Sequence, residues 1–212
     1  MNGSRRNADR TRERILRAAI GEFAAHGWSG ARVERIRQRA RVNTRMIYHY
    51  FGDKRRLYVA VLEHVIGELR QAELRLEVDQ IDPLEGLLQL FEFVDHHFAT
   101  HPELITLFSG ENLLRGRFLA SSAKPPIISS PLMPLMQQLL RRGERKGVIR
   151  AGVDPLHLYI VMVALCYFRR SNAYTLSFLF STDLLAPSWQ GEHKKIAVEL
   201  LTHYLRAGRA AS

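Results

Sequence analysis

The sequence predicts an all-α fold of about nine helices, in which a three-helix N-terminal helix-turn-helix domain precedes a larger C-terminal helical domain. Apolar residues recur with helical spacing along nearly the whole chain, and no segment shows the alternation typical of a β-strand. Glycine, asparagine, aspartate and proline stand where one apolar stripe ends and the next begins. The chain has 212 residues, of which 46% are hydrophobic, so it is long enough to bury a core.

The first three helices are short and closely spaced. We expect the first to run from a cap at Asp9 or Thr11 to His26-Gly27, the second to start after Ser29-Gly30, and the third to cover Thr44–Tyr50. Arg41-Val42 forms the turn between the second and third helices, and Asn43 caps the third. Two short helices joined by a tight turn, after a packing helix, form a helix-turn-helix motif.

Gly52-Asp53 ends this motif and caps a fourth helix of about 25 residues. Further helices are expected over residues 83–100, 102–115, 135–146, 155–172 and 191–207, with one or two additional turns at 174–180. The stretch from Ala120 to Pro134 is rich in serine and proline, which predicts an ordered loop or lid. We place the domain boundary after residue 53, which gives an N-terminal domain of residues 1–53 and a C-terminal domain of residues 54–212.

The excess of positive over negative charge lies entirely in the first 60 residues of the chain. The whole sequence has 31 Lys and Arg residues against 21 Asp and Glu, a net charge of +10. Residues 1–60 hold 15 of the basic and 5 of the acidic residues, so the remainder is neutral overall. Because these basic residues are interleaved with a regular apolar pattern, they belong to a folded module and not to a solubilising tail. Such a module predicts a polyanionic partner.

Several classes of protein are disfavoured by the sequence. The single cysteine, Cys166, cannot form an intramolecular disulfide or a CxxC site, and burial is its expected role. No stretch reaches the roughly 18 apolar residues of a membrane span, and no apolar signal-peptide core follows Met1, so we expect a soluble cytoplasmic protein. No Ser/His/Asp spacing, phosphate-binding glycine loop or HExxH motif occurs, so neither an enzyme nor a cofactor is predicted.

The third helix is expected to enter the DNA major groove. Arg45 lies in its first turn, where it can pair with a guanine edge, and the amides freed at Asn43 can face a phosphate or a base. Aromatic side chains further along can stack or hydrogen-bond to the DNA backbone, and Lys54 can add a phosphate contact. The predicted DNA-binding residues are Arg32, Arg41, Asn43, Thr44, Arg45, Met46, Tyr48, His49, Tyr50 and Lys54.

The run Ile47-Tyr48-His49-Tyr50-Phe51-Gly52-Asp53-Lys54 after a helix-turn-helix resembles the DNA-binding domain of TetR-family transcriptional regulators. The resemblance extends over roughly residues 9–63 and includes Phe23-Ala24-Ala25-His26-Gly27-Trp28. Three positions depart from the family pattern: Arg37 replaces an alanine, Arg41 the turn glycine and Ala31 a threonine. A residue other than glycine at positive φ costs on the order of 1 kcal/mol, which predicts that Arg41 trades turn stability for a phosphate contact.

The C-terminal half resembles, less specifically, the branch of this family that contains the pyrimidine-utilisation repressor RutR. The segments that carry this resemblance are His101-Pro102-Glu103-Leu104, Glu111–Arg117 and Tyr167–Asp183. It implies a helical effector-binding and dimerisation domain, but it does not identify the effector, because ligand chemistry varies widely on one fold. Most aromatic residues here are expected in the core, and a subset can line a pocket. The candidate effector residues are Phe91, Phe108, Glu111, Asn112, Arg115 and Tyr167.

The resemblance implies a homodimeric, ligand-responsive regulator, more often a repressor than an activator, that binds a palindromic operator on double-stranded DNA. The helices over 155–172 and 191–207 are expected to pair across the two-fold as a four-helix bundle. The apolar run Leu156–Phe168 fits this role and an ordinary core helix equally well. Two alternatives stay open: a sequence-tolerant architectural DNA binder, and an enzyme or small-molecule carrier on a helical bundle.

Two other clusters are interpreted without a ligand. His97 and His101 stand at i, i+4 beside His96, but Pro102 follows and no further ligand is suitably spaced, so no metal site is predicted. Basic residues gather at the end of the helix over 135–146, where positive charge is favourable to the helix dipole, and we interpret them as a solvated face. These residues are Arg141, Arg142, Arg145 and Lys146.

Overall fold

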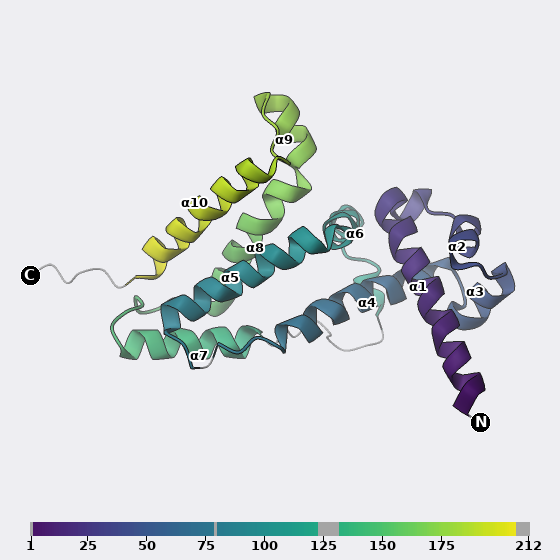
Figure 1. The fold of residues 1–212 in the computed structure, drawn as a ribbon, viewed down its shortest axis with the longest axis horizontal. Helices are drawn as coiled ribbons and strands as arrows, with labels where there is room; N and C mark the ends of the chain where they lie inside the picture. Colours follow the sequence, from purple (N-terminus) through teal and green to yellow (C-terminus); the bar gives the residue numbers. More distant parts are fainter. Residues whose placement is uncertain (1, 79, 123–131, 207–212) are drawn as a thin grey trace, which may run out of the picture. The chain divides into compact units, whose positions relative to one another are not determined.

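The computed structural model describes residues 2–78, 80–122 and 132–206 (Figure 1). Within these ranges the regular structure is helical, apart from an isolated bridge between Ile149 and Arg206, so the all-α prediction is confirmed. The helices are α1 (Asn2–Gly30), α2 (Val33–Ala40), α3 (Thr44–Phe51), α4 (Lys54–Glu73), α5 (Pro83–Thr100), α6 (Pro102–Leu113), the 3-10 helix η1 (Leu119–Ser121), α7 (Leu132–Arg145), α8 (Pro155–Ser171), α9 (Ala173–Phe180) and α10 (Pro187–Leu205).

The chain forms two compact units. The first consists of the residues up to Leu69 together with the segment that starts at Pro102, and the second consists of Arg70–His101 with α7 to α10. The division therefore falls inside α4. The boundary expected after residue 53 separates the helix-turn-helix from α4 and stays a prediction about function. None of the described helices is long and apolar enough to cross a membrane.

The core of the first unit is built from one apolar stripe of each helix. Ile15 and Phe23 of α1, Ile36 of α2, Ile47 of α3 and Leu57 of α4 are all buried. Because α2 and α3 each bury only one stripe, their opposite faces stay open to solvent. α6 packs against α1 and completes the unit.

The ends of α1 and α4 differ from the sequence prediction in part. The predicted cap at Asp9 or Thr11 is wrong, because α1 starts at Asn2 and the Thr11 hydroxyl donates to the Asn7 carbonyl at 3.0 Å from inside the helix. The predicted end is confirmed, since Gly27 adopts φ 62° and ψ −177° and breaks the helical path. α4 has 20 residues instead of about 25 and gives way to a turn after Glu73.

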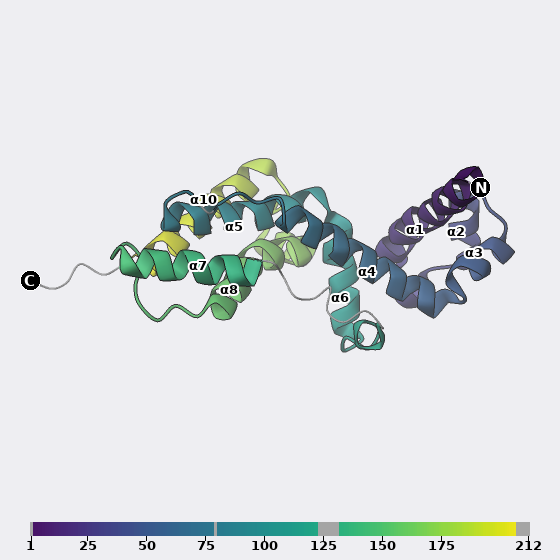
Figure 2. The same ribbon diagram turned by 90° about the horizontal axis from the view of Figure 1, so that it is seen from below.

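Helix α5 is the centre of the second unit and contacts α7, α8 and α10 (Figure 2). α7 begins at Leu132, so Pro134 lies in its first turn, where the missing N–H costs little. Residues 132–134 of the predicted lid are thus helical, and residues 123–131 of it lie outside the described part of the chain. α10 begins at Pro187 instead of Gly191, because proline suits the first helical position.

Candidate nucleic-acid interface

A left-handed residue closes the turn between α2 and α3. Arg41 adopts φ 51° and ψ 51°, which confirms the positive φ expected there. Its amide donates to the Gln38 carbonyl at 3.2 Å, and the Val42 amide donates to the Arg37 carbonyl at 3.1 Å. These bonds satisfy carbonyls at the end of α2. The Arg41 side chain is exposed, so the residue that strains the turn also presents a charge to solvent.

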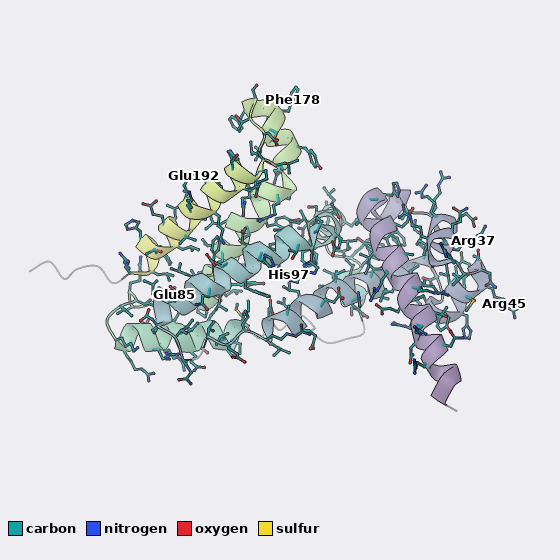
Figure 3. The ribbon with its side chains drawn as sticks, in the orientation of Figure 1. Arg37, Arg45, Glu85, His97, Phe178 and Glu192 are labelled. Atoms are coloured by element: carbon teal, nitrogen blue, oxygen red, sulfur yellow. The ribbon has the colours of Figure 1, made fainter. Side chains whose placement is uncertain are left out.

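Asn43 begins α3 as predicted. Its Oδ1 accepts a hydrogen bond from the Met46 amide at 2.8 Å, while the dipole of the helix makes this end attractive to an anion. Arg45 is exposed in the first turn, and Figure 3 shows it at the outer edge of the first unit, directed away from α1. The start of α3 therefore combines a free guanidinium with a capped helix N-terminus, as contact with a phosphate or base edge requires.

The ten predicted residues differ in exposure. The exposed ones are Arg32, Arg41, Asn43, Arg45, Tyr48 and His49, and the half-buried ones are Thr44, Met46, Tyr50 and Lys54. Lys54 has an aromatic partner, because its Nζ lies 4.7 Å from the centre of the Trp28 ring. Burial lowers the pKa of Lys54, although Glu22 acts in the opposite direction. Lys54 is thus a less available phosphate contact than Arg41.

Glu22 of α1 is fully buried and holds α2 in place. Its Oε1 accepts from the Arg32 amide at 3.0 Å and from the Arg35 Nε at 2.6 Å, and its Oε2 lies 3.5 Å from a terminal nitrogen of Arg39. Burial raises the pKa of Glu22, but the bonds from Arg32 and Arg35 outweigh it, so this pKa lies below its ordinary value of 4.5. The charged carboxylate fixes the start of α2, which has no side-chain cap of its own.

The sequence analysis missed Glu22. The available signal was an acidic residue inside the apolar stripe of a basic helix, between Ala19 and Phe23, since a carboxylate placed there needs a cationic partner. On the solvent side of α2, Arg37 is also engaged, because its Nε donates to Glu34 at 2.5 Å. This contact raises the pKa of Arg37 and lowers that of Glu34.

Two family models match the chain over the elements described above. One, described as bacterial regulatory proteins of the tetR family, matches residues 15–61, which include α2, the turn and α3. The other, described as the tetracyclin repressor-like C-terminal domain, matches residues 83–201, more than half of the chain. The chain belongs to the TetR family. It is therefore a DNA-binding transcriptional regulator.

Individual members of the TetR family are similar over most of their length. The chain is 38% identical to the HTH-type transcriptional repressor NicS of Pseudomonas putida over 177 residues, and this match covers 84% of each protein. It is 27% identical to the HTH-type transcriptional regulator RutR of Escherichia coli K12, over 71% of this chain and 69% of RutR, which agrees with the resemblance seen in the sequence. The solved structure of SCO4942 from Streptomyces coelicolor matches with a TM-score of 0.68 and 25% identity, over 93% and 99% of the two chains.

The six candidate effector residues fall in both units. Phe108, Glu111, Asn112 and Arg115 belong to the first unit, and Phe91 and Tyr167 belong to the second. Glu111 is buried, and its Oε1 accepts from the amides of Phe118 at 2.7 Å and Leu119 at 3.0 Å. These bonds hold the Phe118 ring 4.4 Å from that of Trp28. Glu111 thus has a structural role of its own, and the effector role of all six stays a prediction.

A buried ionic network that the sequence analysis also missed ties the helices of the second unit together. Asp95 of α5 accepts from Arg169 and, at 2.6 Å, from Arg170, both on α8. Burial raises the pKa of Asp95, but the two arginines outweigh it, so this pKa lies below its ordinary value of 3.8. Arg169 also donates to the side chain of Gln190 on α10. The network therefore connects α5, α8 and α10.

His97 of α5 stacks on His101, the residue that caps the end of this helix. The rings of His97 and His101 lie 4.1 Å apart, and burial, helped by the neighbouring histidines, lowers the pKa of His97 to about 4. Within the described residues, no group of three or more His, Cys, Asp or Glu side chains is placed to hold a metal ion. Cys166 is buried as expected, and burial raises its pKa to about 12.

Proposed function

We propose that the chain is a repressor that binds a palindromic operator through α3 and releases it when a small-molecule effector binds. The observation that carries this proposal is the exposed Arg45 beside the capped start of α3. Arg45 reads a base edge and Arg41 binds a phosphate, while the other predicted residues complete the contact. NicS, the relative at 38% identity, is described as a repressor. The site of action is the cytoplasm, where operator DNA is accessible.

The repressor acts as a homodimer, because two recognition helices must reach two half-sites about one helical turn apart or a multiple of that. An exposed apolar face on the second unit supports this assembly. Large apolar side chains that are 46–58% exposed recur at intervals of four or eight residues on both long C-terminal helices. They are Leu156, Ile160 and Phe168 on α8 and Ile196, Leu200 and Tyr204 on α10. A contiguous face of this kind is typical of a protein–protein interface.

Introducing charge on this face should separate the dimer. Ile160→Glu combined with Leu200→Glu would place unpaired carboxylates in the interface, and desolvating them is costly. Size-exclusion chromatography with light scattering should then report the 24.4 kDa monomer instead of twice that mass. Leu113→Glu is the matched control, since Leu113 is 85% exposed on α6 and should leave the dimer intact. If the variant that carries both substitutions still has the mass of a dimer, the proposed interface is contradicted.

Release from DNA is proposed to run through α4, which supplies residues to both units. Lys54, its first residue, directly follows the helix-turn-helix, so a tilt of α4 changes the separation of the two recognition helices. An effector shifts the equilibrium between the DNA-binding conformation and the released one only if it binds one of the two better than the other. Mass spectrometry of a ligand that co-purifies with the protein would identify it. Equal affinity for that ligand in the presence and absence of operator would contradict the mechanism.

Replacing Arg45 by alanine should relax the base preference of DNA binding. A bidentate arginine–guanine contact contributes about 1–3 kcal/mol of discrimination between base pairs. The ratio of the affinity for the preferred duplex to that for a duplex changed at the contacted base pair should therefore fall about 5- to 150-fold. Selection from a randomised duplex library, followed by sequencing, measures this change. Arg41→Ala is the control and should weaken all sequences alike. An unchanged preference in Arg45→Ala would show that Arg45 does not read a base.

Binding to genomic fragments in the presence of competitor DNA separates this function from the two alternatives. A sequence-specific regulator retains a few fragments. An architectural DNA binder retains all of them, with a steep dependence on salt and a small ratio of specific to non-specific affinity. An enzyme or carrier retains none, and that result would leave the basic first quarter of the chain without a partner.

A further inference from the structure

Two cavities lie among the last three helices of the second unit. One has a volume of about 310 Å³ and the other of about 320 Å³, and both are lined by Phe168, Arg169 and His193. The first also reaches Phe180 at the end of α9 and Trp189 at the start of α10. Figure 1 shows α9 beside the ends of α8 and α10 that it joins. We refer to this first cavity as the α9 cavity.

The walls of the α9 cavity are mainly apolar and include three aromatic rings. Phe168 is 58% exposed and Phe180 is 69% exposed, so both leave apolar area uncovered. The ring of Trp189 stacks on that of His193, with centres 5.0 Å apart and planes within 15° of each other. Aromatic walls with a few polar groups are typical of ligand pockets, which start at roughly 300 Å³.

Arg169 supplies a cation to the lining of the α9 cavity. It is only 3% exposed, and its guanidinium donates to Asp95 and to the side chain of Gln190. Within the described part of the chain, its Nε has no hydrogen-bond partner. A buried N–H without an acceptor is costly, so this atom indicates an acceptor from outside the chain.

The network around Arg169 carries an excess of positive charge. Arg169 and Arg170 share the single carboxylate of Asp95. His193 adds no charge at neutral pH, because burial and the neighbouring Arg169 lower its pKa. Asp183 follows α9, but its side chain is exposed and its Oδ1 accepts from a backbone amide at 2.9 Å. One buried positive charge therefore remains beside the cavity, and it favours an anionic ligand.

We propose that the α9 cavity binds a small aromatic carboxylate. The ring of the ligand packs against Phe168, Phe180 and Trp189, and its carboxylate faces the guanidinium of Arg169. Charge-assisted hydrogen bonds to a carboxylate are roughly twice as strong as neutral ones. This inference does not depend on the proposed DNA-binding function, because it concerns a ligand site within the second unit alone.

A second copy of the chain is the alternative occupant, because Phe168 also belongs to the proposed dimer face. The other members of that face are four aliphatic side chains and one tyrosine. These side chains can cover apolar area, but they carry no negative charge to place beside Arg169. The charge of the network therefore favours the carboxylate over the second copy.

The test measures the binding of benzoate through the fluorescence of Trp189. In a Trp28→Phe background, Trp189 is the one tryptophan that remains, and it lines the cavity. Benzoate should change this fluorescence in a saturable way. Benzamide has nearly the same shape without the charge, so it should bind about 10-fold more weakly.

Two phenylalanines of α9 provide a matched pair of variants. Phe180→Ala removes a ring from the cavity wall and should weaken benzoate binding about 2- to 10-fold. Phe178→Ala is the control, because Phe178 is 85% exposed and Figure 3 shows it at the outer end of α9. Both rings are largely exposed, so neither variant should unfold the second unit.

Replacing Arg169 by glutamine tests the charge. In this variant the ratio of benzoate affinity to benzamide affinity should fall from about 10 to about 1. The ratio compares two probes in one protein, so a general loosening of the packing affects both alike. Lys194→Gln is the control on α10, because Lys194 pairs with Glu92 at 3.3 Å, and it should keep the wild-type ratio.

No saturable response to benzoate in the wild-type cavity would overturn the proposal. Equal affinity for benzoate and benzamide, or equal losses in Phe180→Ala and Phe178→Ala, would overturn it too. Benzoate that binds only when Ile160→Glu and Leu200→Glu are present would show that a second copy fills the cavity. All of these outcomes leave the proposed DNA-binding function standing, because they are measured without DNA.

Discussion

Replacing Asp95 by alanine should lower the free energy of unfolding of the second unit by about 3–5 kcal/mol. The substitution leaves Arg169 and Arg170 without the carboxylate that they share. Arg169 is only 3% exposed, so its guanidinium cannot reach water unless α8 unpacks from α5 and α10. Removing one partner of a buried pair is costly because the remaining charge stays buried and unpaired.

The two tryptophans of the chain allow this loss to be assigned to one unit, since Trp28 lies in the first and Trp189 in the second. In a Trp28→Phe background, urea unfolding followed by Trp189 fluorescence reports on the second unit alone. Glu92→Ala is the matched control on α5, because Glu92 forms an exposed pair with Lys194 at 3.3 Å and should contribute less than about 1 kcal/mol. Equal effects of the two substitutions would contradict the structural role of Asp95.

A fully apolar version separates the effect of charge from that of packing. Asp95→Leu combined with Arg169→Met and Arg170→Met removes all three charges and should recover most of the stability lost in Asp95→Ala. The pH dependence gives a second readout. Because the pKa of Asp95 is below its ordinary value of 3.8, its contribution is complete above about pH 4 and is lost as the pH falls through the pKa of the folded state. The apolar version should lack this loss.

Local features of the sequence were sufficient to predict the helix-turn-helix. The Asn43 side chain caps α3 by a bond from the Met46 amide, three residues away. The turn at Arg41 is closed by the bond from the Arg41 amide to the Gln38 carbonyl and by that from the Val42 amide to the Arg37 carbonyl. Interactions over such short separations are set by residue type and spacing, so a single sequence reveals them. The same holds for the apolar stripes that place the helices and for the net positive charge of the first 60 residues.

The tertiary contacts of charged residues could not be predicted in this way. Glu22 reaches Arg35 thirteen residues away on another helix, and Asp95 reaches Arg169 across 74 residues. A charge count treats every arginine of the first unit as available to DNA, whereas folding engages several of them with carboxylates or aromatic rings. Lys54, expected to contact phosphate, lies over Trp28 for this reason. Which cations remain free for a partner is therefore a property of the fold.

Replacing Glu22 by glutamine should destabilise the first unit by about 2–3 kcal/mol, because charge-assisted hydrogen bonds to the Arg32 amide and the Arg35 guanidinium are lost. The cost should be smaller than that of Asp95→Ala, since the side chains of Arg35 and Arg39 are 35% and 50% exposed and water can solvate them. Urea unfolding followed by Trp28 fluorescence, in a Trp189→Phe background, measures the effect. Glu13→Gln, which breaks the exposed pair with Arg17 on the same helix, is the control.

The pH dependence distinguishes a charged Glu22 from a protonated one. Its pKa in the folded state lies below 4.5, so its stabilisation is present above about pH 4.5 and is lost as the pH falls through that folded value. Glu22→Gln should lack this part of the acid destabilisation, whereas Glu13→Gln should retain it. Equal acid sensitivity of the wild type and Glu22→Gln would mean that the carboxylate is not the charged anchor of α2. Because α2 leads directly into the Arg41 turn, loss of this anchor should also weaken DNA binding above pH 4.5, where the wild-type carboxylate is charged.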